Sequence, residues 1–343
     1  MGKILEYFQK FKDSYNNFRP IISDIKVFEY ADGEKHSILP CYFERGFLSK
    51  GKNVAIRDAI YTYGFNSNSK LIYVKFGNNQ ESFLQYFDDS INLYCFEGDN
   101  DKKGNKTLRY IQITELNENG LPYGTVEVDK WNNVYVEKYH YDNSNKLRRI
   151  ENPIHFEYGT YNDALDIEYD SNGEVMLITD KETWLANGLV YKNIPPEEAE
   201  NLRTTIINKI SQNIISSVIN KCQEKNDKVC YISLEIHNEP HTVLSGIYSR
   251  VAFESETNKY VLENSPEFER FIWYYSNNPI DIYDKQLEME CNILVQYYIR
   301  YSDCYTQCRE ILKSIRNILK SYEWEKHIEI SDKFDILEPL TYD

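Results

Sequence analysis

The densest group of chemically capable side chains lies in the stretch Glu235-Ile-His237-Asn-Glu239-Pro-His241. Alternate residues of a β-strand share one face, so two imidazoles and two carboxylates would point the same way. Mixed nitrogen and oxygen ligands of this kind suit zinc or a general acid–base pair. We therefore place a candidate metal site at Glu235, His237 and His241. A proline turns the chain inside this group, which weakens the convergence of these side chains. The alternative is the polar face of an ordinary β-hairpin.

A second set of candidate residues is acidic. Residues 151–200 hold twelve acidic and two basic side chains, so most of the net charge of −15 lies in one window. Aromatic residues lie between these carboxylates on expected strands, which predicts a negative surface that attracts and anchors a basic protein. The alternative is a solvated sheet face that keeps the protein in solution. The expected partner-binding residues are Glu157, Tyr158, Tyr161, Asp163, Asp166, Glu168, Tyr169, Asp170, Glu174 and Trp184.

Several well-marked classes of site are missing from the sequence. It has no GxxxxGK[ST], GxGxxG, GxSxG or HExxH motif and no pair of CxxC units, so we expect no cofactor. The net charge of −15 argues against nucleic-acid binding. Seven cysteines without a tight framework indicate a reducing cytoplasm, and the usage of Asn, Ile, Lys and Tyr is typical of AT-rich bacteria. No apolar run is long enough to predict a membrane span.

The elements that carry these residues predict an α+β protein in three parts. We expect a small N-terminal α+β unit over 1–98, a central antiparallel β-meander over 99–192, and a C-terminal α/β unit with a β-hairpin and long helices over 193–343. In the first part, the expected helices cover 3–17 and 81–90, and the expected strands cover 25–30, 38–43, 56–65 and 71–76.

The meander shows clean alternation. Val126 and Val128 share one face of a predicted strand, while Glu127 and Asp129 share the other. Over 164–170, Leu, Ile and Tyr alternate with three acids in the same way. Polar turn clusters at 117–120, 131–133, 142–145 and 170–173 separate the strands.

Two strand-turn-strand units match each other. Residues 141–150 read YDNSNKLRRI and residues 169–178 read YDSNGEVMLI, so both have Tyr-Asp, a polar turn and an apolar strand that ends in Ile. This pattern resembles the tyrosine-aspartate repeats of Rhs-type bacterial proteins, and the resemblance covers about 80 residues. It implies a large sheet built from such units. The alternative is a set of generic hairpins, since Asn-Gly supplies positive φ in any tight turn.

The C-terminal part begins at a proline pair. Pro196 suits the first position of a helix that we expect to reach Cys222, with three glutamates near its positive end. Strands over 229–236 and 244–254 should pair as a hairpin, and a helix is expected over 265–275.

The final segment, 281–325, carries apolar residues at steps of four and three over five heptads. The apolar stripe is wide, which favours packing inside the same domain. The alternatives are a homodimer seam along one helix, or a break into two helices near Ser302-Asp303.

These patterns favour a non-catalytic protein-binding protein. The acidic, tyrosine-rich strands and the Rhs-like repeats lead us to expect a cytoplasmic bacterial immunity or antitoxin-like protein that binds a basic partner, such as a toxin domain, and neither nucleic acid nor membrane. The alternatives are a metal-dependent hydrolase that uses Glu235, His237 and His241, and a scaffold that self-associates through helix 281–325.

Overall fold

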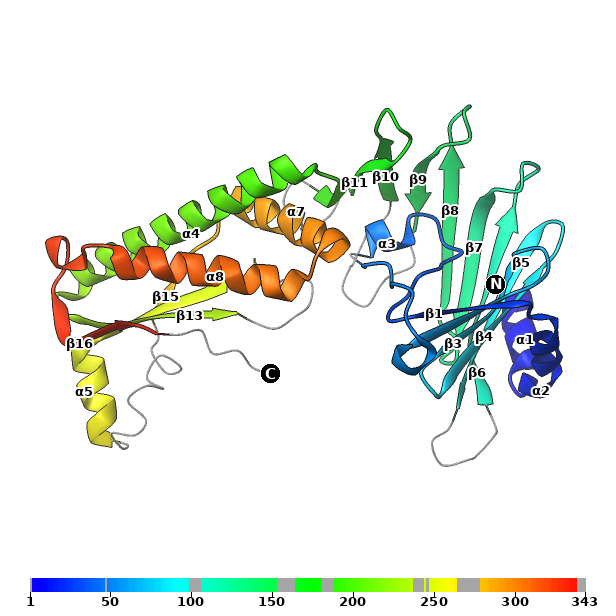
Figure 1. Ribbon diagram of the computed structural model, residues 1–343, viewed down its shortest axis with the longest axis horizontal. Coiled ribbons are helices and arrows are strands. Elements are labelled where there is room, and N and C mark those ends of the chain that lie inside the picture. The colour runs from blue at the N-terminus through cyan, green and yellow to red at the C-terminus, as the bar shows by residue number, and fades with distance from the viewer. Residues whose placement is uncertain are drawn as a thin grey trace. The chain divides into compact units, whose positions relative to one another are not determined.

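The computed structural model describes residues 2–46, 48–98, 106–152, 164–180, 188–236, 244, 247–263 and 278–337. It confirms the expected α+β class, since helices accompany a large antiparallel sheet and a small mixed sheet. The chain divides into two compact units, residues 1–184 and 185–343, which are described separately below (Figure 1).

The first unit is a long antiparallel meander in which β1 to β11 are hydrogen-bonded in chain order. β5 and β6 lie on either side of the boundary that we expected at residue 98, yet they pair along their whole length. The same sheet therefore continues across that point. The strands are β1 (Val27–Ala31), β2 (Tyr61–Phe65), β3 (Leu71–Phe76), β4 (Gln80–Tyr86), β5 (Ser90–Gly98), β6 (Lys106–Leu116), β7 (Pro122–Asp129), β8 (Val134–Tyr141), β9 (Leu147–Glu151), β10 (Ala164–Tyr169) and β11 (Val175–Thr179).

Two short helices cover one face of this sheet (Figure 1). The helix expected over 3–17 is interrupted: α1 spans Gly2–Phe11, α2 spans Tyr15–Phe18, and a 3-10 turn follows at Arg19–Asp24. Phe8 and Phe18 are buried against aromatic and aliphatic side chains of β3 to β7. Aromatic pairs such as Phe18 with Tyr94, whose ring centroids are 4.4 Å apart, fill this core.

Two local predictions in this unit were wrong. The segment expected as strand 38–43 instead leads into a short helix, α3 (Tyr42–Arg45), after Cys41 adopts a left-handed φ of 52°. Pro40 lies in this segment and cannot donate to a sheet ladder. Residues 81–90 form no helix, because β4 and the start of β5 pair there. Their aromatic spacing fits a helix, but pairing with strands on both sides decides the structure. The strand expected from residue 56 begins only at Tyr61, after a 3-10 turn at Ile56–Asp58.

The polar turn clusters do separate the strands as expected. Gly120 and Gly173 lie in hairpin turns with φ of 72° and 83°, and Asn145 takes φ of 61° in another. Positive φ is accessible to glycine and tolerated by asparagine, so these residues allow the tight reversals.

The second unit packs helices against a small mixed sheet in the order β15-β14-β13-β16, where β13 pairs antiparallel with β14 and parallel with β16. The predicted hairpin is confirmed. The helix expected over 265–275 lies outside the described residues. The elements are β12 (Leu189–Lys192), α4 (Pro196–Lys225), β13 (Val229–Ile236), β14 (Ile247–Phe253), α5 (Glu254–Glu263), β15 (Pro279–Ile280), α7 (Lys285–Tyr301), α8 (Cys304–Ser321), a 3-10 turn (Trp324–Lys326) and β16 (Ile330–Ile336).

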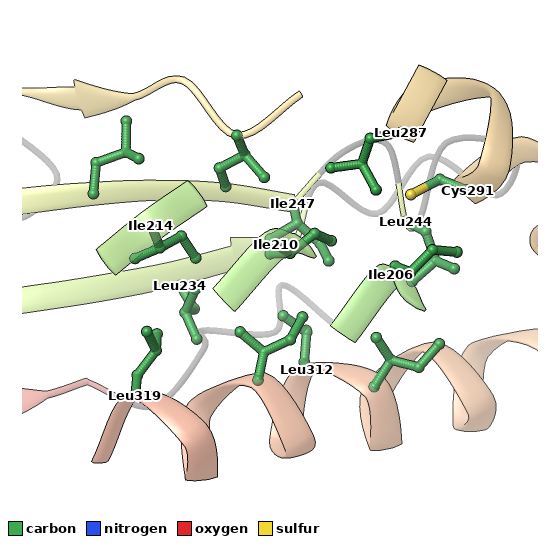
Figure 2. Packing of buried hydrophobic residues seen from close by; sticks show 14 of the residues in the cluster. Ile206, Ile210, Ile214, Leu234, Leu244, Ile247, Leu287, Cys291, Leu312 and Leu319 are labelled. Carbon is green, nitrogen blue, oxygen red and sulfur yellow. The ribbon is translucent and has the colours of Figure 1, made fainter. Parts of the chain in front are cut away.

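The core of this unit is formed by the apolar stripe of α4. Ile206, Ile210 and Ile214 are fully buried among side chains of α7, α8 and the sheet (Figure 2). Pro196 begins α4, as the sequence predicts, and Asn226 ends it in the left-handed conformation.

The expected continuous helix over 281–325 was wrong, and the break near Ser302-Asp303 is confirmed. Ser302 is extended, and the Asp303 carboxylate caps α8 by accepting a hydrogen bond from the Thr306 amide. The apolar heptad positions of both helices mostly face the core of the unit, as in Leu287 and Leu312. This burial matches the expectation of packing within one domain.

Candidate functional site

The metal site expected at Glu235, His237 and His241 lies outside the described side chains. The structure gives only the backbone of Glu235, which pairs with Tyr248 of β14. Within the described part of the chain, no group of three or more His, Cys, Asp or Glu side chains is placed to hold a metal ion. The metal-site hypothesis therefore stays a prediction.

The acidic surface is described only in part. Glu157, Tyr158, Tyr161, Asp163 and Trp184 lie outside the described residues. The remaining five lie on β10 and at the start of the next turn and strand: Asp166, Glu168, Tyr169, Asp170 and Glu174.

Two of these carboxylates are used within the sheet. Asp166 accepts from Arg149 of β9 at 2.9 Å. Asp170 accepts from the amides of Asn172 and Glu174, which closes the β10–β11 turn. Neither carboxylate is therefore a simple free negative charge on this surface.

The other residues of this set differ in exposure. The Tyr169 ring is covered by Lys146 and Arg148, with the cations 5.3 and 5.6 Å from its centroid, and burial raises its pKa. Glu168 and Glu174 are exposed and form no ion pair with a described residue. Only these two carboxylates of the set are open to a partner in the described structure.

A cavity of about 480 Å³ lies elsewhere on the sheet, under a segment of irregular chain. We call it the sheet cavity. Its floor comes from β2 to β7, and its cover from residues 34–42. The floor residues are Tyr61, Leu71, Val74, Phe76, Gln80, Ser82, Leu84, Leu93, Arg109, Tyr110, Gln112 and Glu127, and the cover residues are Glu34, His36, Ser37, Ile38, Leu39 and Tyr42.

Strand alternation places this cavity on the face opposite α1 and α2. On β6, Tyr110 and Gln112 line the cavity, whereas Ile111 packs in the aromatic core beneath the helices. On β7, Glu127 lines the cavity and Val128 enters the same core. Because successive side chains of a strand point to opposite faces, each of these strands contributes side chains both to the sheet cavity and to the aromatic core.

A buried ion pair joins α3, which follows the cover, to the sheet. Arg45 of α3 donates two hydrogen bonds to Glu137 of β8, at 2.7 and 3.2 Å, and both side chains are fully buried. Tyr139 donates to the same carboxylate and lies 3.0 Å from Thr125. A bidentate pair with further hydrogen bonds fixes geometry strongly, so α3 is held in one position.

Further hydrogen bonds order the cover itself. The Tyr42 hydroxyl donates to Glu34 at 2.7 Å, and the Lys35 amide donates to the Tyr63 hydroxyl of β2 at 2.7 Å. The Gly51 amide donates to the Glu34 carbonyl at 2.7 Å. The cover is therefore tied both to the sheet and to the returning chain, and the cavity exists before any ligand arrives.

Several ionisable groups inside the cavity have raised pKa values. Burial raises the pKa of Glu127 to about 7, with smaller contributions from the charges of Glu137 and Asp129. Burial also raises the pKa of Glu34, against the hydrogen bond from Tyr42. Burial raises the pKa of Tyr110 far above its usual value, and the charges of Glu127 and Glu34 both add to that rise.

The basic side chains that line this cavity have acidic partners. Arg109 lies 3.4 Å from Glu97, which also binds Lys130 at 3.2 Å. His36 lies 3.2 Å from Glu29. Glu127, in contrast, accepts no hydrogen bond and forms no ion pair with any residue that the structure describes.

The sequence analysis missed this cavity. It placed Glu127 correctly on the face opposite Val126 and Val128, and the alternation is confirmed. It made no prediction that this face is covered. The missed signal is the long segment 32–58 between two strands, which contains apolar Ile38 and Leu39 and a cationic Arg45, and which returns to cover the sheet.

Comparison with protein-family models finds no match to this chain, and no curated protein matches its sequence. Among the described helices, none combines the length and apolarity that crossing a membrane requires; this includes α4 with its 30 residues.

Proposed function

We propose that the N-terminal unit is a binding module that holds a small molecule in the sheet cavity. The observation that carries this proposal is the carboxyl of Glu127, which faces a preformed cavity of mixed polar and apolar lining without a partner in the described protein. Glu127 is only partly exposed, and the desolvation of its carboxyl costs free energy when it ionises; a ligand that donates to the carboxylate offsets that cost.

The size and lining of the cavity support the proposal. A volume of about 480 Å³ falls within the range of roughly 300–1,000 Å³ that is typical of small-molecule sites. Aliphatic and aromatic side chains share the walls with polar and charged groups. This mixture gives both apolar contact area and orientation, as ligand sites require.

Binding of Nile red, an uncharged dye that fluoresces in apolar surroundings, tests this proposal. Val74 on β3 lines the cavity and is only partly buried, so Val74→Trp places an indole in the cavity. We expect this variant to weaken dye binding at least tenfold while the melting temperature is kept.

The matched control is Val136→Trp on β8. Val136 is 38% exposed and lines a shallow apolar groove on the α1 side of the sheet. Dye binding that survives Val74→Trp and disappears in Val136→Trp would place the dye in that groove and contradict the proposal.

A protein partner is a second candidate function, favoured by the exposure of Glu168 and Glu174 on the β10–β11 hairpin. We propose that a basic protein, such as a toxin domain in a bacterial immunity pair, binds this hairpin. The double variant Glu168→Lys with Glu174→Lys removes the free acidic charge and leaves the turn-closing Asp170 in place. Capture of such a basic toxin domain by this variant should be lost. Unchanged capture would exclude this surface.

A further inference from the structure

We infer that the sheet cavity selects a ligand with an apolar body and a cationic nitrogen head group, an alkyl- or arylalkyl-amine in chemical class. The head group would lie at the carboxyl of Glu127, and the body along the apolar wall. This inference rests on the proposed function of the cavity and adds the class of its ligand.

The first support is the position of two carboxyls on opposite walls. Glu127 on β7 lines the floor of the cavity, and Glu34 lines it from the cover. Both line the same cavity as Tyr110, and their charges add to the rise in its pKa. Glu34 receives one hydrogen bond, from Tyr42 at 2.7 Å, and keeps acceptor capacity for a second donor. An ammonium group offers three donors and a positive charge.

The second support is the charge that surrounds Glu127. Glu137 and Asp129 repel its ionised form from neighbouring positions of β8 and β7, and Arg109 of β6 attracts it as the smallest contribution. Glu137 is neutralised by Arg45, and Arg109 lies beside Glu97. The charge balance inside the cavity is therefore negative once Glu127 ionises, which favours a cation and disfavours an anion.

The third support is the apolar wall beside these carboxyls. Leu84 and Leu93 face the cavity from the paired strands β4 and β5, opposite one another in register. Leu71 and Val74 extend the wall on β3, and Leu39 closes it from the cover. An inorganic cation would leave this wall in contact with water, whereas an aryl or alkyl chain would bury it at about 25 cal/mol per Å².

Binding of the ammonium group is coupled to the release of a proton. Near neutral pH the free site is partly protonated at Glu127, and an ammonium head group stabilises the carboxylate. Binding therefore releases the Glu127 carboxyl proton to solvent, and affinity falls as pH decreases below about 7. Two unit charges in contact also retain their attraction better inside the cavity than in water.

Three probes of matched shape test the inference on the full chain: 4-phenylbutylamine, 4-phenylbutan-1-ol and 4-phenylbutanoate, measured by displacement of Nile red at pH 8. We expect the amine to bind at least tenfold more tightly than the alcohol, and the carboxylate to bind most weakly. In Glu127→Gln, the ratio of amine to alcohol affinity should fall close to one. In Glu168→Gln, which changes an exposed carboxyl on β10, the ratio should stay as in the wild type.

The outcomes separate this inference from the proposed function. Equal affinity for amine and alcohol, or tightest binding of the carboxylate, overturns the cationic assignment but leaves a small-molecule site. An amine preference that persists in Glu127→Gln also overturns it. Dye binding that is insensitive to Val74→Trp removes the site itself, and with it both proposals.

Discussion

Arg45 Nη1 lies 2.7 Å from Glu137 Oε1, although the two residues are 92 positions apart in sequence and both side chains have no exposure to solvent. This pair connects the cover of the sheet cavity to the sheet. The position of the cover therefore depends in part on this buried contact between α3 and β8.

Removing one member of this pair should destabilise the protein strongly. Arg45→Met leaves Glu137 buried without its cation, which typically costs about 3–5 kcal/mol. Urea unfolding followed by circular dichroism measures the loss. Arg148→Met is the matched control, because Arg148 pairs with Asp142 at a half-exposed position and should cost at most about 1 kcal/mol. Similar losses for both variants would contradict the importance of the buried pair.

The stability of the first unit should depend on pH through Glu127. Its folded pKa of about 7 lies above its ordinary value of 4.5, so the folded state holds this proton more tightly than the unfolded chain. The resulting stabilisation is complete below about pH 4.5 and is lost as pH rises through 7. The loss amounts to roughly 3 kcal/mol. Urea unfolding of Glu127→Gln should lack this component of the difference between pH 5 and pH 8. The same difference in wild type and variant would refute it.

Truncation of a buried side chain in the core of the second unit should lower the free energy of unfolding, because it leaves a cavity. Ile210 on α4 is fully buried within the cluster in Figure 2. Ile210→Ala should therefore reduce the free energy of unfolding by about 2–5 kcal/mol. Asn208→Ala, two positions away on the exposed side of α4, should change it by at most about 0.5 kcal/mol. Thermal unfolding of both variants provides the comparison, and equal melting temperatures would contradict the described packing.

The start of α8 should depend on the capping carboxylate of Asp303. Its oxygens accept from the Thr306 amide at 3.3 Å and from the Thr306 hydroxyl at 2.8 Å. Asp303→Ala removes this acceptor and should lower the midpoint of chemical unfolding measurably. Asp303→Asn keeps a side-chain oxygen at the cap and should recover most of that loss. A loss as large in the Asn variant would show that charge, and not the cap, matters at this position.

The sequence predicted the elements whose signals lie within a few neighbouring residues. The hairpins β6 to β9 follow polar turn clusters, and α4 begins at Pro196 as its capping pattern indicates. The break of segment 281–325 into two helices near Ser302-Asp303 was one of the predicted alternatives. The failures at 38–43 and 81–90 occur where pairing and covering contacts override local spacing.

What the sequence determined by itself is thus the alternation of each strand, the turns between strands and the apolar stripes of the helices. These features depend on hydrogen bonds and side-chain directions that a few neighbouring residues set. Only the tertiary structure decided that the Glu127 face is covered. That outcome depends on Arg45 reaching Glu137 across 92 residues and on the burial of both, and burial is a property of the packed molecule that no local pattern contains.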